Sequence, residues 1–359
     1  MNRYGEGALG NPGCKQRATT RLLVLVGMCL AVLIAQIDTS VVNLATHAIG
    51  DSFQAGVAPL QWVLDAYNLV YAVLLLSGGL VADLYGRRRA FSVGTIVMGA
   101  GSLICAFSPS VGVLIGGRAI TGIAAALLLP SSLAIIRVVW PEPAARGRVL
   151  GVWASCNGLA FAIGPTLGGI LIEHFGWRSV FLLAVPLASA AFVLAQAAVP
   201  ESADPNDRHF DLQGQLLGAL TLGGVALAAI AVHDEGWLWI AALGVATIAL
   251  FLFLRIERRR GQAALVPLDL FRIRAFSGGV TTTATMTFGI YGMIFLIPLL
   301  WQSEDHLTPH DAGIALLSVS LAFFLVSTQS GRLSERIGAR LMIAIGIGLG
   351  RVAECVEIA

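Results

Sequence analysis

Residues 22–42 read LLVLVGMCLAVLIAQIDTSVV, a run in which Asp38 is the single charged side chain. A helix needs about 20 mostly apolar residues to cross the ~30 Å hydrocarbon layer of a bilayer, so this run has the length and composition of a membrane span. Similar blocks follow at residues 60–81, 91–107, 111–138, 149–172, 180–199, 212–232, 238–254, 278–301 and 312–330. The sequence therefore predicts an all-α polytopic membrane protein with ten full transmembrane helices, and the shorter run at 341–350 predicts a partial eleventh.

The composition excludes a soluble protein. Charged residues make up 12% of the 359-residue chain and hydrophobic residues 57%, with a mean hydropathy of +0.81, whereas soluble domains carry about 25% charged residues. The basic residues are dispersed between apolar blocks, which argues against a nucleic-acid partner. The cysteines and histidines show no metal-ligand spacing, and no phosphate-binding loop or nucleophile motif is present. We therefore expect no metal, no cofactor and no enzyme activity.

The basic residues also predict the orientation of the helices. Of the 23 Lys and Arg residues, all except Arg118, Arg178 and Arg351 fall in segments that the alternation of spans puts on one side. Basic loops favour the cytoplasm, so we expect a multi-pass protein of the cell membrane with its N-terminus in the cytoplasm. Residues 1–21 are polar and basic without a convincing cleavage site, so we expect the first block to remain as a helix.

These spans divide the chain into six parts. They are a cytoplasmic N-terminal segment (1–21), a first six-helix bundle (22–199), a cytoplasmic linker (200–211), two extra helices (212–254), a cytoplasmic basic loop (255–275) and an incomplete second bundle (276–359). The last part holds only two full spans and a fragment, so we expect a chain that is truncated at its C-terminal end.

Two oppositely charged side chains lie inside predicted spans. Ionisable groups within apolar blocks are costly to insert and are functional candidates by default. Asp38 on the first block and Arg118 on the fourth can neutralise each other in a low-dielectric interior, where a lone charge would be expensive. A plain structural salt bridge is one interpretation. We favour proton coupling, because a carboxylate can bind and release a proton as its surroundings change.

A second carboxylate, Asp65, lies near the outer end of the second block, with Trp62 and Tyr67 on either side in the sequence. The aromatic residues can form an interfacial belt at headgroup depth. Alternatively, the carboxylate and the rings can bind a cationic substrate. Both interpretations stay open, and our candidates for a substrate cavity are Asp65, Trp62 and Asn43.

The stretch GLVADLYGRRR ends the second block at residues 79–89. Its glycines permit close helix contact and a turn, and its carboxylate can pair with an arginine or cap a neighbouring helix. We expect a cytoplasmic gate built from Gly79, Asp83, Gly86 and Arg87. A weaker copy of the motif lies at residues 331–340, and internal repeats are typical of transporter folds.

The fifth block contains Gly164, Pro165 and Gly168 within the stretch GLAFAIGPTLGG. Small residues form a face for close packing, and a proline removes a backbone donor and kinks the helix. Ordinary helix packing is one interpretation. The other is a contact that limits how far two halves of the protein open, which would reduce proton leak.

Together these motifs resemble those of the major facilitator superfamily. The stretch at 79–89 resembles the family's motif between helices two and three, and Arg118 with Gly122 resembles its helix-four motif. The Gly164 stretch is similar to the helix-five motif of antiporters, and DTSVVN at 38–43 is similar to the first-helix signature of the fourteen-helix drug:proton antiporters.

The resemblance implies two six-helix bundles that rock about a central cavity, with the extra helix pair between them in the sequence. It implies a multidrug-efflux antiporter in which inward proton flow drives the export of amphipathic, cationic drugs. Asp38 and Arg118 would belong to the proton-coupling network. Asp83 and Arg87 would belong to the gate, and the fifth-helix motif would shape a helix contact.

The partners of such a protein would be a small-molecule substrate, protons and the lipid bilayer. Two alternatives remain open from the sequence. One is a dedicated exporter of a single endogenous metabolite or antibiotic. The other is a truncated membrane protein that does not transport.

Overall fold

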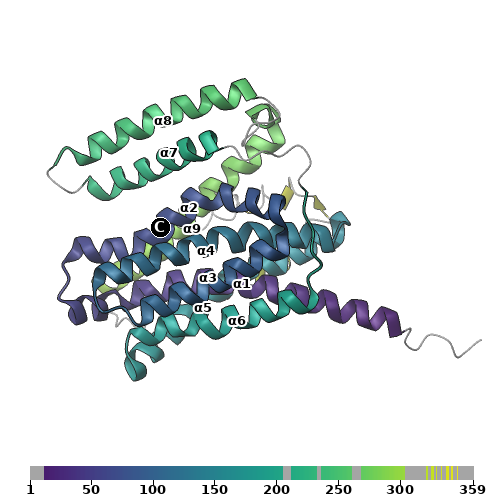
Figure 1. The fold of residues 1–359 in the computed structure, drawn as a ribbon, viewed down its shortest axis with the longest axis horizontal. Helices are drawn as coiled ribbons and strands as arrows, with labels where there is room; N and C mark the ends of the chain where they lie inside the picture. The colour runs from purple at the N-terminus through teal and green to yellow at the C-terminus, as the bar shows by residue number, and fades with distance from the viewer. Residues whose placement is uncertain are drawn as a thin grey trace, which may run out of the picture.

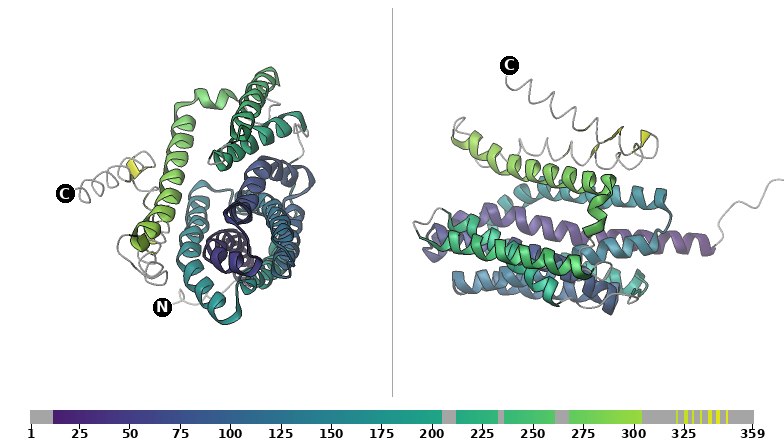
Figure 2. Two further views of the ribbon diagram at one scale, coloured as in Figure 1. Left: turned by 90° about the vertical axis from the view of Figure 1, so that its left-hand side faces the viewer. Right: turned by 90° about the horizontal axis from the view of Figure 1, so that it is seen from above.

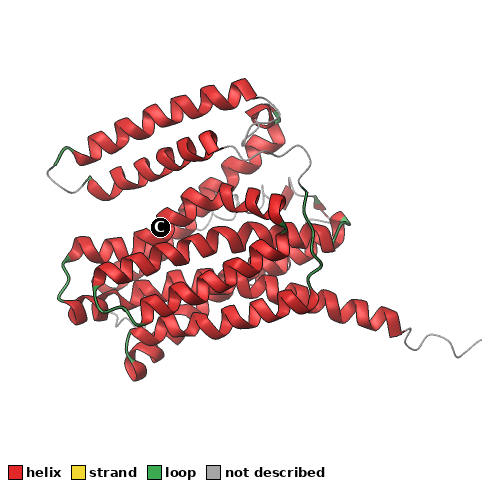
Figure 3. Cartoon of the chain, viewed as in Figure 1, coloured by secondary structure: helices red, strands yellow, loops and turns green. Residues whose placement is uncertain are grey.

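The computed structural model describes residues 12–204, 212–232, 236–260 and 268–303, together with isolated positions between 321 and 346. Its helices (Figure 1) are α1 (Pro12–Phe53), α2 (Val57–Tyr85), α3 (Arg87–Ala106), α4 (Val111–Val139), α5 (Pro143–Phe175), α6 (Arg178–Ala198), α7 (Leu212–Ala231), α8 (Leu238–Arg260), the short 3-10 helix η2 (Leu268–Arg272) and α9 (Arg274–Ser303). The described residues include no strand (Figure 3). The prediction of an all-α chain is therefore confirmed.

Seven helices within the described residues are long and apolar enough to cross a membrane. They are the part of α1 from Thr19 onwards, α2, α3, α4, α6, α7 and α8. A continuous helix satisfies its backbone N–H and C=O groups internally, as hydrocarbon surroundings require. α5 and α9 occupy the places predicted for the fifth and ninth spans. The predicted tenth span (312–330), the copied motif (331–340) and the fragment at 341–350 lie outside the described residues, apart from isolated positions.

Helices α1 to α6 pack into one bundle (Figure 2). Within it, α4 packs against α2 and α3, α1 packs against α5 and α6, and α3 packs against α6. α7 and α8 form a pair that lies beside the bundle and contacts it through α2 (Figure 1). η2 and α9 follow α8 and run outside the six-helix bundle (Figure 2).

The turns between the first helices follow local sequence signals. α2 passes into α3 at Gly86, whose φ of 110° is rarely adopted by residues with a Cβ. Ser110 caps α4, because its hydroxyl accepts a hydrogen bond from the Val113 N–H at 3.4 Å. Pro143 lies in the first turn of α5, where a missing N–H costs nothing. These local signals mark where α3, α4 and α5 begin.

Glycines bring α2 and α4 into close contact. A Cβ added at Gly78 would clash with the Ala126 carbonyl oxygen, and one added at Gly122 would lie 2.7 Å from the Tyr67 carbonyl oxygen. The backbones of the two helices therefore touch directly, as small residues allow in other membrane helix pairs. The close packing of α2 and α4 depends on the absence of a Cβ at Gly78 and Gly122.

The close approach lies one residue earlier than the sequence suggested. At Gly79, which we predicted to permit helix contact, an added Cβ would meet the Pro130 Cβ at 3.6 Å, an ordinary distance. Successive helical residues point in directions about 100° apart. Only Gly78 faces the backbone of α4 directly.

These neighbouring glycines provide a matched test. We expect Gly78→Ala to lower the unfolding free energy by about 1–3 kcal/mol, because the added methyl group must push α2 away from α4. We expect Gly79→Ala to be neutral or slightly stabilising, since glycine inside a helix costs up to about 1 kcal/mol relative to alanine. Thermal unfolding of the purified protein in detergent measures both. An equal loss of unfolding free energy in the two variants would contradict the assignment of the close helix contact to Gly78.

Candidate functional site

The structure brings Asp38 of α1 and Arg118 of α4 together inside the bundle. The Arg118 Nη1 donates a hydrogen bond to the Asp38 Oδ2, and the two groups form an ion pair. Only 1% of the Arg118 side chain and 2% of the Asp38 side chain are exposed. A charge so buried is tolerated only with a partner, which explains why two residues 80 positions apart share one site.

Arg118 is also held by α2. Its Nε donates to the Val63 carbonyl oxygen at 3.0 Å, and its guanidinium carbon lies 4.7 Å from the centre of the Tyr67 ring. The Tyr67 hydroxyl in turn donates to the Ala35 carbonyl oxygen of α1 at 3.2 Å. Arg118 is therefore surrounded by a countercharge, a carbonyl dipole and an aromatic face.

The contact of Tyr67 with Arg118 was not predicted, because in the sequence Tyr67 stands out only as a neighbour of Asp65. Residues four apart share a face of a helix, whereas residues two apart point to different sides. Val63 and Tyr67 accordingly face Arg118 together and are buried, while Asp65 points elsewhere and is half-buried. The four-residue spacing of Val63 and Tyr67 was the feature of the sequence that could have placed both on one face of the helix.

The three cavity candidates lie on two helices. Asn43 is exposed on α1, and its side-chain amide donates to the Thr39 carbonyl oxygen at 3.1 Å. Trp62 and Asp65 of α2 are half-buried. In the described part of the chain no hydrogen bond joins these three side chains to one another.

The gate candidates lie at the turn between α2 and α3. Arg87 donates to the Asp83 Oδ1 from Nη2 at 2.9 Å and from Nε at 3.1 Å. Only 12% of the Asp83 side chain and 13% of the Arg87 side chain are exposed. Gly86 supplies the sharp turn that places the carboxylate and the guanidinium side by side.

Glu201 joins this turn from the segment after α6. Its Oε1 accepts a hydrogen bond from the Arg88 N–H at 3.1 Å, and its Oε2 lies 3.7 Å from the Nε atoms of Arg88 and Arg89. The Arg87 N–H donates to the Ser202 carbonyl oxygen at 2.8 Å. A carboxylate at a helix N-terminus is favoured by the unpaired N–H groups there. Sequence reasoning missed Glu201 because it lies 113 residues from the helix that it caps.

The glycines of the fifth-helix motif face α1. A Cβ at Gly164 would clash with the Ser40 Oγ, and one at Gly168 would lie 2.5 Å from the Val41 Cγ1. Larger residues would separate α5 from the part of α1 that carries Asp38. The side chain of Pro165 lies outside the described part of the chain.

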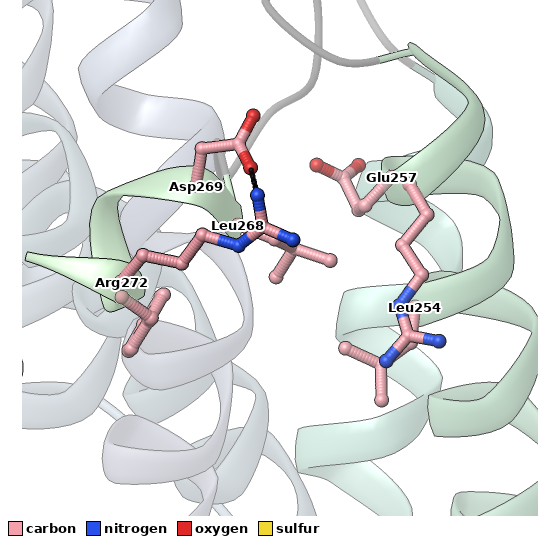
Figure 4. Close-up of a pocket in the computed structure, with 7 residues that line it drawn as sticks. Leu254, Glu257, Leu268, Asp269 and Arg272 are labelled. Atoms are coloured by element: carbon pink, nitrogen blue, oxygen red, sulfur yellow. Dashed lines mark ion pairs between the residues drawn. The ribbon is translucent and has the colours of Figure 1, made fainter.

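A cavity of about 610 Å³ lies elsewhere, between the end of α8 and η2 (Figure 4). Its lining includes Leu254, Glu257, Leu268, Asp269 and Arg272. The Asp269 and Arg272 side chains pair at 3.5 Å and are largely exposed. None of the predicted site residues lines this cavity, so it is separate from the candidate site.

Comparison with known protein families identifies the family to which this arrangement of helices and motifs belongs. The model of the Major Facilitator Superfamily matches residues 28–353. The chain belongs to this superfamily. Seven helices within the described residues are long and apolar enough to cross a membrane, and this member of the Major Facilitator Superfamily is a multi-pass membrane protein.

Two relatives and one solved structure extend the comparison. The multidrug resistance protein Stp of Mycobacterium tuberculosis is 36% identical over 336 residues, which cover 91% of this chain and 62% of Stp. The methylenomycin A resistance protein of Bacillus subtilis is 31% identical over 344 residues, which cover 94% of this chain and 73% of that protein. The chain thus spans less than two thirds of the length of Stp. The structure of the proton:xylose symporter XylE shares the fold, with a TM-score of 0.63 at 14% identity over 89% of this chain and 70% of XylE.

The Glu201 contact gives a local prediction. Glu201→Ala removes the acceptor for the Arg88 N–H, so we expect the first turn of α3 to open more readily by about 1 kcal/mol, a roughly fivefold rise in amide exchange. Hydrogen–deuterium exchange of the full chain measures this. The matched control is Glu142→Ala, because Glu142 precedes α5 but makes no capping hydrogen bond with its side chain. Unchanged exchange at α3 in the Glu201 variant would refute the capping role.

Proposed function

We propose that this protein exports amphipathic, cationic drugs across the cell membrane in exchange for protons, with its N-terminus in the cytoplasm. The observation that carries the proposal is the ion pair between Asp38 and Arg118, buried between two helices of the first bundle. Membership of the superfamily supports transport rather than catalysis. The relatives named for drug resistance support drug export, and the proposal extends their activity to this shorter chain.

In this proposal Asp38 is the proton-binding group. While Asp38 is ionised, its attraction to Arg118 ties α1 to α4 in a low-dielectric interior, where such an attraction is strong. A proton on Asp38 removes the negative charge and weakens this tie. Because binding and release of the proton then favour different helix arrangements, inward proton flow can drive a substrate outward.

The charged cluster at the α2–α3 turn would serve as the gate. Asp83 with Arg87, and Glu201 with Arg88, hold α2, α3 and the segment after α6 together. The pair of Glu201 with Arg88 is partly exposed, so it contributes modestly and can break during a transport cycle. The tight contact of α5 with α1 would limit the opening of this bundle and reduce proton leak.

Asp65, Trp62 and Asn43 would line the substrate cavity. A half-buried carboxylate attracts a cation, and an aromatic ring nearby adds a cation–π contribution. The amide of Asn43 can exchange its local hydrogen bond to the α1 backbone for one to a substrate. These groups together suit an amphipathic cation.

A second candidate function is the export of a single endogenous metabolite or antibiotic. The observation that favours it is the match to a protein named for resistance to one compound, methylenomycin A, over 73% of that protein's length. Broad drug export predicts measurable transport of several unrelated cations. Export of one compound from a diverse panel would favour the narrower function.

The proton-coupling role is tested with Asp38→Asn. In proteoliposomes with an imposed pH gradient, we expect export of a lipophilic cation such as ethidium to fall at least about tenfold, because the amide cannot cycle a proton. The control is Asp51→Asn, on the same helix, where the carboxylate is 73% exposed.

Three outcomes have different meanings. Export by the Asp38 variant at the parent rate would disprove the coupling role. No dye movement by the parent would disprove export and favour the alternative of a non-transporting membrane protein. Loss in both variants would show that the effect is not specific to Asp38, which also counts against the role.

Asp65→Asn tests the cavity. If Asp65 binds the positive charge of the substrate, we expect the half-saturating concentration of a cationic substrate to rise roughly tenfold, the equivalent of about 1.4 kcal/mol. A neutral substrate of similar size should be exported as by the parent. Equal effects on charged and neutral substrates would assign Asp65 to the interfacial belt instead.

A further inference from the structure

The contacts of Arg118 come from two different helices. Asp38 on α1 supplies the countercharge. Val63 and Tyr67 on α2 supply a carbonyl oxygen at 3.0 Å and a ring centre at 4.7 Å. With 1% of its surface exposed, Arg118 has no access to water that would replace a lost contact.

Only one of these contacts depends on the charge of Asp38. A guanidinium group stays protonated under all ordinary conditions. When Asp38 takes up a proton the countercharge disappears, but the carbonyl dipole of Val63 and the negative face of the Tyr67 ring remain. The α2 contacts are therefore the ones available to a buried cation that has lost its ion pair.

Helix packing keeps Arg118 close to these α2 groups. Gly122 lies one turn after Arg118 and faces the Tyr67 carbonyl oxygen, where an added Cβ would lie only 2.7 Å away. Because Gly78 packs against the backbone of α4 at Ala126 as well, α2 and α4 form a close pair along much of their length. α1 has two polar links to this pair, the ion pair of Asp38 and the hydrogen bond from the Tyr67 hydroxyl to the Ala35 carbonyl oxygen, in addition to apolar packing in the bundle core.

We propose that Tyr67 is a positioning residue that keeps Arg118 on α2 when Asp38 is neutral, so that protonation weakens the tie of α1 to α4 while α2 and α4 stay together. This inference rests on the proposed role of Asp38 as the proton-binding group. Among the described residues, Cys105 of α3 is a further titratable group that interacts with Asp38 and Arg118. Tyr71 of α2 stacks on Tyr67. Tyr67 is the one whose ring lies over the guanidinium.

The test is a set of double-mutant comparisons on the full chain, read by thermal unfolding in detergent. Asp38→Asn imitates the neutral carboxyl, and Tyr67→Met removes the ring while roughly keeping its volume. We expect the Met substitution to lower Tm by at least roughly 2 °C more in the Asp38→Asn background than in the parent, because the cation then has neither countercharge nor ring. Tyr67→Phe keeps the ring and should not show this excess.

Two controls separate the positioning role from packing. Tyr71→Leu removes a neighbouring ring that stacks on Tyr67 at 6.2 Å between centroids, and it should cost the same in the parent and in the Asp38→Asn background. In the Asp38→Asn, Arg118→Gln background no cation is buried at this site, so Tyr67→Met should lower Tm no more than it does in the parent. If Tyr67→Met does not accumulate in the parent, the Asp38→Asn background is compared with the Asp38→Asn, Arg118→Gln background instead. The cost of Tyr67→Met should then be larger in the first of these two backgrounds.

An equal cost of Tyr67→Met in all three backgrounds would overturn the inference, because the ring would then contribute packing alone. A failure to fold confined to the combination of Tyr67→Met with Asp38→Asn would support it. This result is independent of the transport assay. Export by the Asp38→Asn variant at the parent rate would refute proton coupling, whereas additive unfolding data would refute only the role of Tyr67.

Discussion

A guanidinium group keeps its charge, so Arg118 can lie inside an apolar bundle only where the protein supplies a countercharge and acceptors. This requirement explains how α1, α2 and α4 meet. Asp38 supplies the charge, and Val63 and Tyr67 supply the acceptors. Three helices that are separate in the sequence are thereby held around one cation.

The small residues of the bundle make this arrangement possible. Gly122 follows Arg118 by one turn, so the same face of α4 presents a cation and then a surface without a side chain to α2. Near Asp38, Gly164 of α5 leaves room for Ser40 of α1. In hydrocarbon no hydrophobic driving force favours the association of helices, so close contacts and polar links of this kind must hold them together.

α2 connects two charged clusters of the molecule. Tyr67 lies at the buried ion pair, and Asp83 lies at the turn where α2 passes into α3. Tyr67 and Asp83 are sixteen positions apart on one continuous helix, a rise of about 24 Å. A shift of α2 at the ion pair would therefore reach the turn, where Glu201 joins α3 to the segment after α6. The proposed transport cycle needs a link of this kind between Asp38 and the α2–α3 turn.

The apolar blocks alone predicted the helical class and the places of helices α1 to α9, because the transfer of an apolar block into hydrocarbon is a property of that block. The sequence also singled out Asp38 and Arg118, since charges inside apolar blocks are rare and need partners. Which face of each helix meets which neighbour could be seen only in the folded chain. Thus Gly78 rather than Gly79 meets the backbone of α4, Tyr67 faces the guanidinium, and a carboxylate 113 residues away caps α3. Such contacts join residues far apart in the chain, and no local pattern records them.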